Sequence, residues 1–461
     1  MIWTGCGGTR RPCRFRPDPS GETTATLSRP PVARAGFQAG ALKARRSRGT
    51  RKRLKSCPAA RSDILAVMLR PIALLAAWAA SAAGQQSRLD RLLADMLIFD
   101  AHIDTPRYFV DEGYRLADEH GYYELDIPRM RRGRLGAVLF GIYAQPGDYT
   151  PAQWLPRSLE CLEALHAEVR RNSKDMEFAW TSGDILRIHR SGKLAAMASL
   201  EGGHLIADSL RVLRLFHTLG VRYLTLAHFK SNNFADSMTD VAAHNGLSAA
   251  GRELVAEMNR LGMIVDVSHI SDKAVMDAVA ASKAPVIASH SSVKSIAPIP
   301  RNMPDEVIKA IAAKGGVVCI NFHAGYLHKP AYDVFARNRP RRDEEIREVL
   351  SLRANDPSRW ELVRSIQRRY YREMPSVDLK KLLEHIDYVA RLAGPDHVGL
   401  GSDFDGISGM VPAGMEDVSK YPSIVRGLID LGYKDEDVRK IMGLNLVRVL
   451  KENEAVAEKL K

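Results

Sequence analysis

The chain has 461 residues, which is long for one domain, and its 45% hydrophobic and 26% charged residues are ordinary for a globular protein. The formal net charge is +13, but residues 1–67 contain 15 Lys and Arg against 3 Asp and Glu, which leaves 52 against 51 in the rest. A nearly neutral body does not attract a polyanion, so we exclude nucleic acid as a partner.

The first 67 residues are rich in Arg, Pro, Gly and Ala and show no apolar periodicity. We predict a disordered basic leader over residues 1–67, and we expect translation of the natural product to start at Met68. Residues 68–84 resemble a secretory signal peptide, with Arg70, an apolar run, and small residues at Ser81 and Ala83. The apolar run is too short for a stable membrane anchor. We therefore predict export to a periplasm or to the extracellular space.

The cysteines are as unevenly distributed as the charges. Cys6, Cys13 and Cys57 lie in the leader, which leaves Cys161 and Cys319 for the folded part. Two cysteines so far apart form neither a disulfide framework nor a CxxC zinc site. We predict that both are buried, inert thiols.

From residue 85 onward, short apolar runs alternate with longer amphipathic stretches such as 248–261, 272–281, 304–313 and 379–393, which predicts one α/β domain over residues 85–461. No run alternates strictly between apolar and polar residues, so the strands belong to a parallel sheet that is covered on both faces. Eight such units favour a (β/α)8 TIM barrel. An open doubly wound sheet is the alternative, but no GxGxxG motif follows the first run. The predicted strands are 97–101, 137–143, 195–200, 223–227, 263–267, 286–289, 317–321 and 398–401.

The segment 329–375 interrupts this alternation just before the last predicted strand. It is dense in Arg and Glu and is predicted to be a helical insertion. It could form a lid over the barrel or a peripheral addition, and we favour the peripheral addition.

Titratable residues lie where the predicted strands end, and the carboxyl ends of the strands are where a barrel places its active site. His102 and Asp104 follow the first strand two residues apart, so both side chains point the same way in an extended chain. Five later strands each supply one further titratable residue at the same end. These residues are Glu201, His228, His269, His290 and Asp403.

Each strand end alone has an ordinary structural interpretation, but six strands that deliver His, Asp or Glu at one end predict a metal site. Imidazoles and carboxylates without thiolates suit Zn²⁺, and Mn²⁺, Co²⁺ or Fe²⁺ would also accept them. Five ligand side chains are more than one tetrahedral metal ion with an open coordination position can accept. We therefore predict two metal ions. The predicted ligands are His102, Asp104, Glu201, His269 and His290.

Several segments resemble the membrane (renal) dipeptidase family, which belongs to the amidohydrolase barrels. They occur in order between residues 98 and 451, and the resemblance implies a bacterial, exported, zinc-dependent dipeptidase with a metal-dependent-hydrolase barrel. The matching segments are FDAHIDTP, SLEGGHLIADSLRVLRLFHTLGVRYLTLAH, GMIVDVSHIS, VIASHSSVKSI, RNMPDEVIKAIAAKGGVVCINF and HVGLGSDFDGI.

The resemblance also implies how the two zinc ions are held. His102 and Asp104 would bind one ion, His269 and His290 would bind the other, and Glu201 would bridge them. A hydroxide between the two metals would attack the peptide carbonyl, because metal ions lower the pKa of bound water.

Four residues are implied as substrate contacts. His228 would stabilise the oxyanion, Arg301 would pair with the C-terminal carboxylate of a dipeptide, and Tyr326 would contribute nearby. Asp403 would transfer the proton and bind the substrate amine. Small dipeptides are thus the expected partners, and a homodimer is compatible with the resemblance.

The sequence departs from the mammalian members of this family. Phe229 and Lys230 occupy the place of a cysteine, the C-terminal GPI signal is missing, and the insertion 329–375 has no counterpart. Two alternatives stay open: another binuclear amidohydrolase that acts on N-acyl amino acids or lactams, and a non-catalytic exported binding protein. Arg301 favours dipeptides over the first, and the intact set of strand-end residues argues against the second.

Overall fold

The computed structural model describes residues 84–461 except 147, 354, 355 and 357. The predicted basic leader and nearly all of the predicted signal peptide lie outside the described residues, so both stay predictions. Within the described part of the chain, no helix is both long and apolar enough to cross a membrane.

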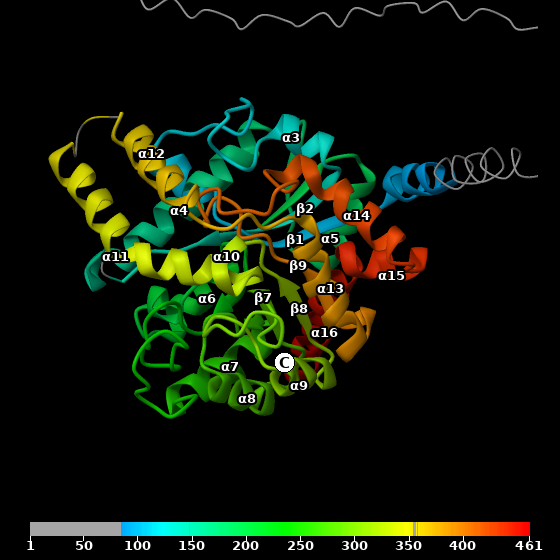
Figure 1. Ribbon diagram of the computed structural model, residues 1–461. Coiled ribbons are helices and arrows are strands. Elements are labelled where there is room, and N and C mark those ends of the chain that lie inside the picture. Colours follow the sequence, from blue (N-terminus) through cyan, green and yellow to red (C-terminus); the bar gives the residue numbers. More distant parts are fainter. Residues whose placement is uncertain (1–83, 147, 354–355, 357) are drawn as a thin grey trace, which may run out of the picture. The chain divides into compact units, whose positions relative to one another are not determined.

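Eight parallel strands close into a barrel that is surrounded by helices (Figure 1). The hydrogen-bonded order is β2-β1-β9-β8-β7-β6-β5-β4, and pairing of β2 with β4 closes the ring. The prediction of a (β/α)8 barrel is confirmed, and every predicted strand overlaps an observed one. The barrel strands are β1 (Ile98–Ile103), β2 (Leu135–Ile142), β4 (Leu194–Glu201), β5 (Val221–Thr225), β6 (Ile264–Asp266), β7 (Ile287–Ser291), β8 (Val317–Ile320) and β9 (Val398–Leu400).

All residues of these strands are buried, which explains why their sequences show no polar alternation. Neighbouring residues nevertheless belong to different apolar clusters. Ile98 packs in the larger cluster that the surrounding helices share, whereas Phe99, Met197 and Tyr223 belong to a second cluster to which the last helix adds Leu450. Side chains of this second cluster fill the barrel interior, so the barrel is a packed core rather than a pore.

The surrounding helices begin and end at residues that favour helix termini. In α7, the N-cap Ser248 accepts a hydrogen bond from Gly251 N, and Gly262 at the C-terminus has a φ of 76°, which suits glycine. Four predicted helices are observed, as α7, α8, α9 and α13. The helices are α2 (Pro106–Asp111), α3 (Ile127–Arg132), α4 (Pro151–Arg171), α5 (Ser182–Arg190), α6 (Leu210–Thr218), α7 (Ala249–Leu261), α8 (Asp272–Ala281), α9 (Asp305–Ala313), α13 (Leu379–Ala393), α14 (Tyr421–Asp430), α15 (Asp435–Arg439) and α16 (Asn445–Leu460).

Two features were not predicted in detail. The short strand β3 (Met176–Phe178) pairs with β4 outside the ring, and three residues are too few to give a periodic signal. The insertion is helical, as predicted, and consists of α11 (Lys329–Leu352) and α12 (Arg359–Tyr371), which follow the single turn α10 (Ala324–Leu327). Both cysteines of the barrel domain, Cys161 and Cys319, are buried and free, as predicted.

Close contact between strand ends depends on Gly401. A Cβ at this position would overlap the carbonyl oxygen of Ser289, which is backbone and cannot move aside. We expect Gly401→Ala to destabilise the fold by about 1–3 kcal/mol, the usual cost of overpacking. Thermal unfolding followed by circular dichroism measures this, with Gly121→Ala as the control because nothing lies within 4 Å of a Cβ there. Equal melting temperatures for the two variants would contradict the packing argument.

Candidate metal centre

The five predicted metal ligands converge at the carboxyl ends of the barrel strands. The carboxylate of Glu201, at the end of β4, lies at their centre. Its Oε1 is 3.1 Å from Nε2 of His269, 3.2 Å from Nε2 of His290 and 3.7 Å from Nε2 of His102. Asp104 completes the set, with its Oδ1 3.2 Å from His102 Nε2. The structure therefore brings together residues that are up to 188 positions apart in the sequence.

Two of the histidines are oriented by hydrogen bonds to their Nδ1 atoms. The Tyr223 hydroxyl donates to the Ala101 carbonyl oxygen (3.2 Å) and also contacts His102 Nδ1. The Ser289 hydroxyl donates to Asp266 Oδ2 (2.7 Å) and lies 2.8 Å from His290 Nδ1. Because each hydroxyl already donates elsewhere, we assign the proton to Nδ1 of each ring. This tautomer leaves the Nε2 lone pair free to bind a metal.

Glycines make room for the Asp104 carboxylate. A Cβ at Gly141 or Gly406 would overlap an Asp104 oxygen, and a Cβ at Gly141 would also lie 2.7 Å from Cε1 of His102. Asp403 adopts a φ of 63° and His269 a φ of 68°, both in the left-handed region. The chain thus bends sharply just after β9 and β6, and these bends turn the two side chains toward the centre.

The donor atoms fit metal ions. His102 Nε2 and Asp104 Oδ1 are buried, and neither has a hydrogen-bond partner among the described residues. A buried polar atom without a partner is costly, and a cation bound between these atoms would remove that cost. Three groups of three side chains have ligand atoms within 4.8 Å of one another, and Glu201 belongs to two of them, which suits a bridging position. The groups are His102, Glu201 and His290; Glu201, His228 and His269; and His102, Asp104 and Asp403.

Burial sets the charges of the centre. It lowers the pKa of His228, His269 and His290 well below the ordinary value, so these imidazoles are neutral and have lone pairs to share. Burial also raises the pKa of Glu201, and burial followed by the charge of Asp104 raises the pKa of Asp403 to about 7. Buried carboxylates that repel one another and face neutral imidazoles are stabilised by cations, so charge and geometry point to the same ligand.

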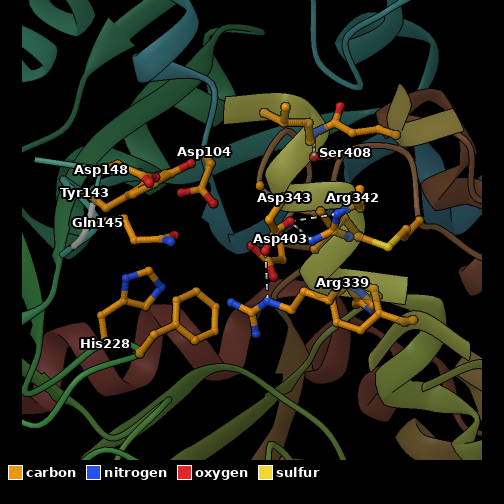
Figure 2. A pocket seen from close by; sticks show the side chains of 18 of the residues that line it. Asp104, Tyr143, Gln145, Asp148, His228, Arg339, Arg342, Asp343, Asp403 and Ser408 are labelled. Atoms are coloured by element: carbon orange, nitrogen blue, oxygen red, sulfur yellow. Dashed lines mark hydrogen bonds and ion pairs between the residues drawn. The ribbon is translucent and has the colours of Figure 1, made fainter. Parts of the chain in front are cut away.

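A cavity of about 310 Å³ lies next to this centre and is lined by Asp104, Glu201, His228, Tyr326 and Asp403. The other side of the cavity comes from α11 and α12, as Figure 2 shows for Arg339, Arg342 and Asp343. The favoured interpretation of the insertion as a peripheral addition is therefore wrong. The composition of the segment predicted its helices, but composition does not encode where they pack.

The predicted substrate contacts differ in their access to the cavity. His228 and Tyr326 line it directly, whereas Arg301 is only 2% exposed and is not among the described lining residues. The Arg301 guanidinium donates to Ser291 Oγ (3.0 Å) and to the His290 carbonyl oxygen (2.7 Å), and its Cζ lies 5.7 Å from the centre of the Tyr326 ring.

Two polar residues at the site were missed by the sequence prediction. Asn321 donates from Nδ2 to Asp403 Oδ2 (2.9 Å) and so orients that carboxylate. His323 lines the cavity and stacks on Tyr326. Both follow β8 in the segment INFHAGY, where the only signal was a polar residue directly after a buried strand.

A closed (β/α)8 barrel that gathers imidazoles and carboxylates at the carboxyl ends of its strands defines a metal-dependent barrel hydrolase. The model of the membrane dipeptidase family (Peptidase family M19) matches residues 86–461. The chain therefore belongs to the membrane dipeptidase family.

Two similar proteins that are named as dipeptidases support this membership. Dipeptidase tcpJ of Claviceps purpurea is 38% identical over 345 residues, which cover 73% of this chain and 71% of the relative. Dipeptidase verJ of Clonostachys rogersoniana is 33% identical over 397 residues, which cover 81% and 89%. Both relatives are fungal, so they give no support to the bacterial origin expected from the sequence.

Solved structures show the same fold. The probable dipeptidase PvdM from Pseudomonas aeruginosa superposes with a TM-score of 0.70 at 29% identity, covering 81% of this chain and 99% of that one. A metallopeptidase from Rhodobacter sphaeroides, solved with a phosphinate mimic of the dipeptide L-Ala-D-Ala, gives a TM-score of 0.64 at 25% identity, covering 78% and 99%.

The donor set predicts a metal content that can be measured without an activity assay. We expect about two divalent ions per chain in the wild type and about one in Asp104→Ala, because the second ion keeps its own histidines. Glu201→Gln should lower the occupancy of both sites, because its Oε1 faces histidines of both predicted pairs. Elemental analysis after dialysis against zinc measures this. Asp343→Asn is the control, since Asp343 lines the cavity outside the donor groups, and loss of metal in it would contradict the assignment.

Proposed function

We propose that this protein is a two-metal dipeptidase that hydrolyses the peptide bond of dipeptides. Family membership supports the reaction class. The observation that carries the proposal is the position of Glu201, whose Oε1 has four imidazole Nε2 atoms at 3.1–3.7 Å. These belong to His102, His228, His269 and His290.

The resident metals are proposed to be two Zn²⁺ ions. His102 and Asp104 would hold one, His269 and His290 the other, and Glu201 would bridge them. Two bound divalent ions lower the pKa of water and polarise a carbonyl oxygen.

Asp403 is suited to move the proton of the reaction. Its carboxylate lies beside His102 and Asp104, where it can accept a proton from water and return it to the leaving amine nitrogen. Asn321 donates to its Oδ2, which fixes the plane of the carboxylate. Neutral His228 retains one ring proton, and a hydrogen bond from this ring stabilises the negative charge that develops on the carbonyl oxygen.

Arg301 and Tyr326 are proposed to bind the free carboxylate of the dipeptide. Arg301 Nε is buried without a hydrogen-bond partner among the described residues, and Arg301 Cζ lies 5.7 Å from the centre of the Tyr326 ring. A site that binds both the carboxylate and the amine of its substrate excludes longer peptides.

We also propose that the protein is exported through the predicted signal at residues 68–84. Mass spectrometry of the protein recovered outside the cytoplasm would then give an N-terminus close to Gly84. An N-terminus at Met1 or Met68 in that fraction would contradict cleavage.

The dipeptidase proposal is tested by hydrolysis of Gly-dehydroPhe and of L,L and L,D dipeptides by the zinc-loaded chain. Cleavage of dipeptides but not of tripeptides, lost after chelation and restored by zinc, is the expected result. If the protein binds two metals yet leaves every dipeptide intact, the substrate assignment is wrong, and N-acyl amino acids and lactams become the next substrates to assay.

Asp403→Asn should lower kcat by roughly 10²–10⁴-fold, because an amide cannot accept the proton. The metal content should stay close to that of the wild type, since Asp403 is not among the five proposed ligands. Steady-state kinetics with elemental analysis on the same sample separates the two effects. A kcat within a few-fold of the wild type would exclude Asp403 as the proton carrier.

A further inference from the structure

His323 presents an unused hydrogen-bond donor to the cavity. Its Nδ1 accepts from Gly325 N at 2.9 Å, and burial, followed by the charge of Arg342, lowers its pKa to about 3. The ring is therefore neutral and carries its proton on Nε2. This atom is buried without a partner among the described residues, and His323 lines the cavity at only 2% exposure. A buried donor without an acceptor is costly in the free protein and indicates a ligand oxygen.

Arg339 brings a second set of free donors from the insertion. Its Nε donates to Asp343 Oδ2 at 3.4 Å, and its Cζ lies 5.4 Å from the centre of the Phe229 ring. Its two Nη atoms have no hydrogen-bond partner in the described part of the chain. Figure 2 shows Arg339 and Asp343 directed into the same space as His228 and Asp104. Arg339 can therefore reach a molecule that lies at the metal centre.

The charges on this side of the cavity do not balance. Asp343 is shared between Arg339 and Arg342, which donates to its Oδ1 at 2.7 Å, and Arg347 also lines the cavity. Asp148 is the other lining acid outside the metal centre, so three arginines face two aspartates. The excess positive charge, next to unpaired donors, suits a carboxylate.

The position of His323 relates these donors to one part of a dipeptide. The His323 ring stacks on Tyr326 with centroids 4.1 Å apart, and Arg301 lies 5.7 Å from the same Tyr326 ring. Under the proposed function, Arg301 and Tyr326 bind the free carboxylate of the second residue of the dipeptide. His323 then lies beside the side chain of that residue.

We propose that His323 and Arg339 form a subsite for an acidic side chain on the second residue of the dipeptide. This inference rests on the proposed function and adds a substrate class to it, namely dipeptides that end in Glu or Asp. The His323 Nε2–H and the Arg339 guanidinium donate to the side-chain carboxylate. Arg339, which belongs to the insertion, gives the preference for an acidic second residue.

The test compares kcat/KM for Ala-Glu with that for Ala-Gln, which has nearly the same shape but no charge. We expect the zinc-loaded wild type to favour Ala-Glu by roughly tenfold, the effect of one good charge-assisted contact. Arg339→Gln should bring this ratio close to one, and Arg339→Lys should keep most of it. Glu-Ala and Gln-Ala form the second arm, and their ratio should be near one.

Variants of His323 separate the donor from the structural role of the ring. Asn can accept from Gly325 N but does not reach the Nε2 position, whereas the amide of Gln can reach it. We therefore expect His323→Asn to lose the preference for Ala-Glu and His323→Gln to restore part of it. Arg337→Gln is the matched control, since Arg337 is exposed on the same helix and does not line the cavity.

The outcomes distinguish the subsite from the reaction. A wild-type ratio near one for Ala-Glu over Ala-Gln, an equal loss in Arg337→Gln, or a preference for Glu-Ala over Gln-Ala overturns the subsite and leaves the dipeptidase proposal standing. If the wild type cleaves none of the four dipeptides while it binds two metals, the proposed function is wrong and the subsite is wrong with it.

Discussion

The burial of carboxylates at one end of the barrel is the constraint on which the rest of the site depends. Asp104, Glu201 and Asp403 are each less than a tenth exposed, and the imidazoles of His228, His269 and His290 beside them are neutral. Charged groups in such a place are unstable unless opposite charge balances them. Within the described residues no lysine or arginine forms an ion pair with these three carboxylates, and bound cations would balance their charge. The barrel thus stores an electrostatic cost that metal binding relieves.

Two further buried aspartates hold together the strand ends that carry the proposed metal ligands. Asp266 accepts hydrogen bonds from the Ser289 backbone N at 2.8 Å and from the Thr225 hydroxyl at 2.5 Å, which ties β5, β6 and β7 together. Asp100 accepts from the backbone N of His102 at 2.9 Å and of Ser402 at 3.1 Å, which ties β1 to the end of β9. Neither aspartate was predicted as a functional residue. Their contacts fix the backbone from which the ligands project, so the order of the centre comes from the strands rather than from loops.

The barrel and the strand-end residues could be predicted because both depend on local patterns. An apolar run of five residues followed by His, Asp or Glu is visible in the sequence, and parallel strands bring such ends together whatever the connections. Asn321 and His323 were missed because a single polar residue after a strand is common without a function. The location of α11 was missed for a different reason. Among the described residues of that helix only Ala331 is buried, so no apolar stripe indicated the surface on which it packs.

Polar contacts hold the insertion in place. On α12, Trp360 Nε1 donates to the Asp111 carbonyl oxygen at 3.0 Å, and Gln367 Nε2 donates to Ser408 Oγ at 3.0 Å, in the loop that follows β9. The same loop contains Asp403, so the support of the insertion and the proposed proton carrier share one segment of chain. The barrel supplies the whole metal centre, and the insertion supplies one side of the cavity. The metal centre and this side of the cavity can therefore vary separately. Under the proposed function, the barrel would determine the reaction and the insertion would determine which dipeptides reach it.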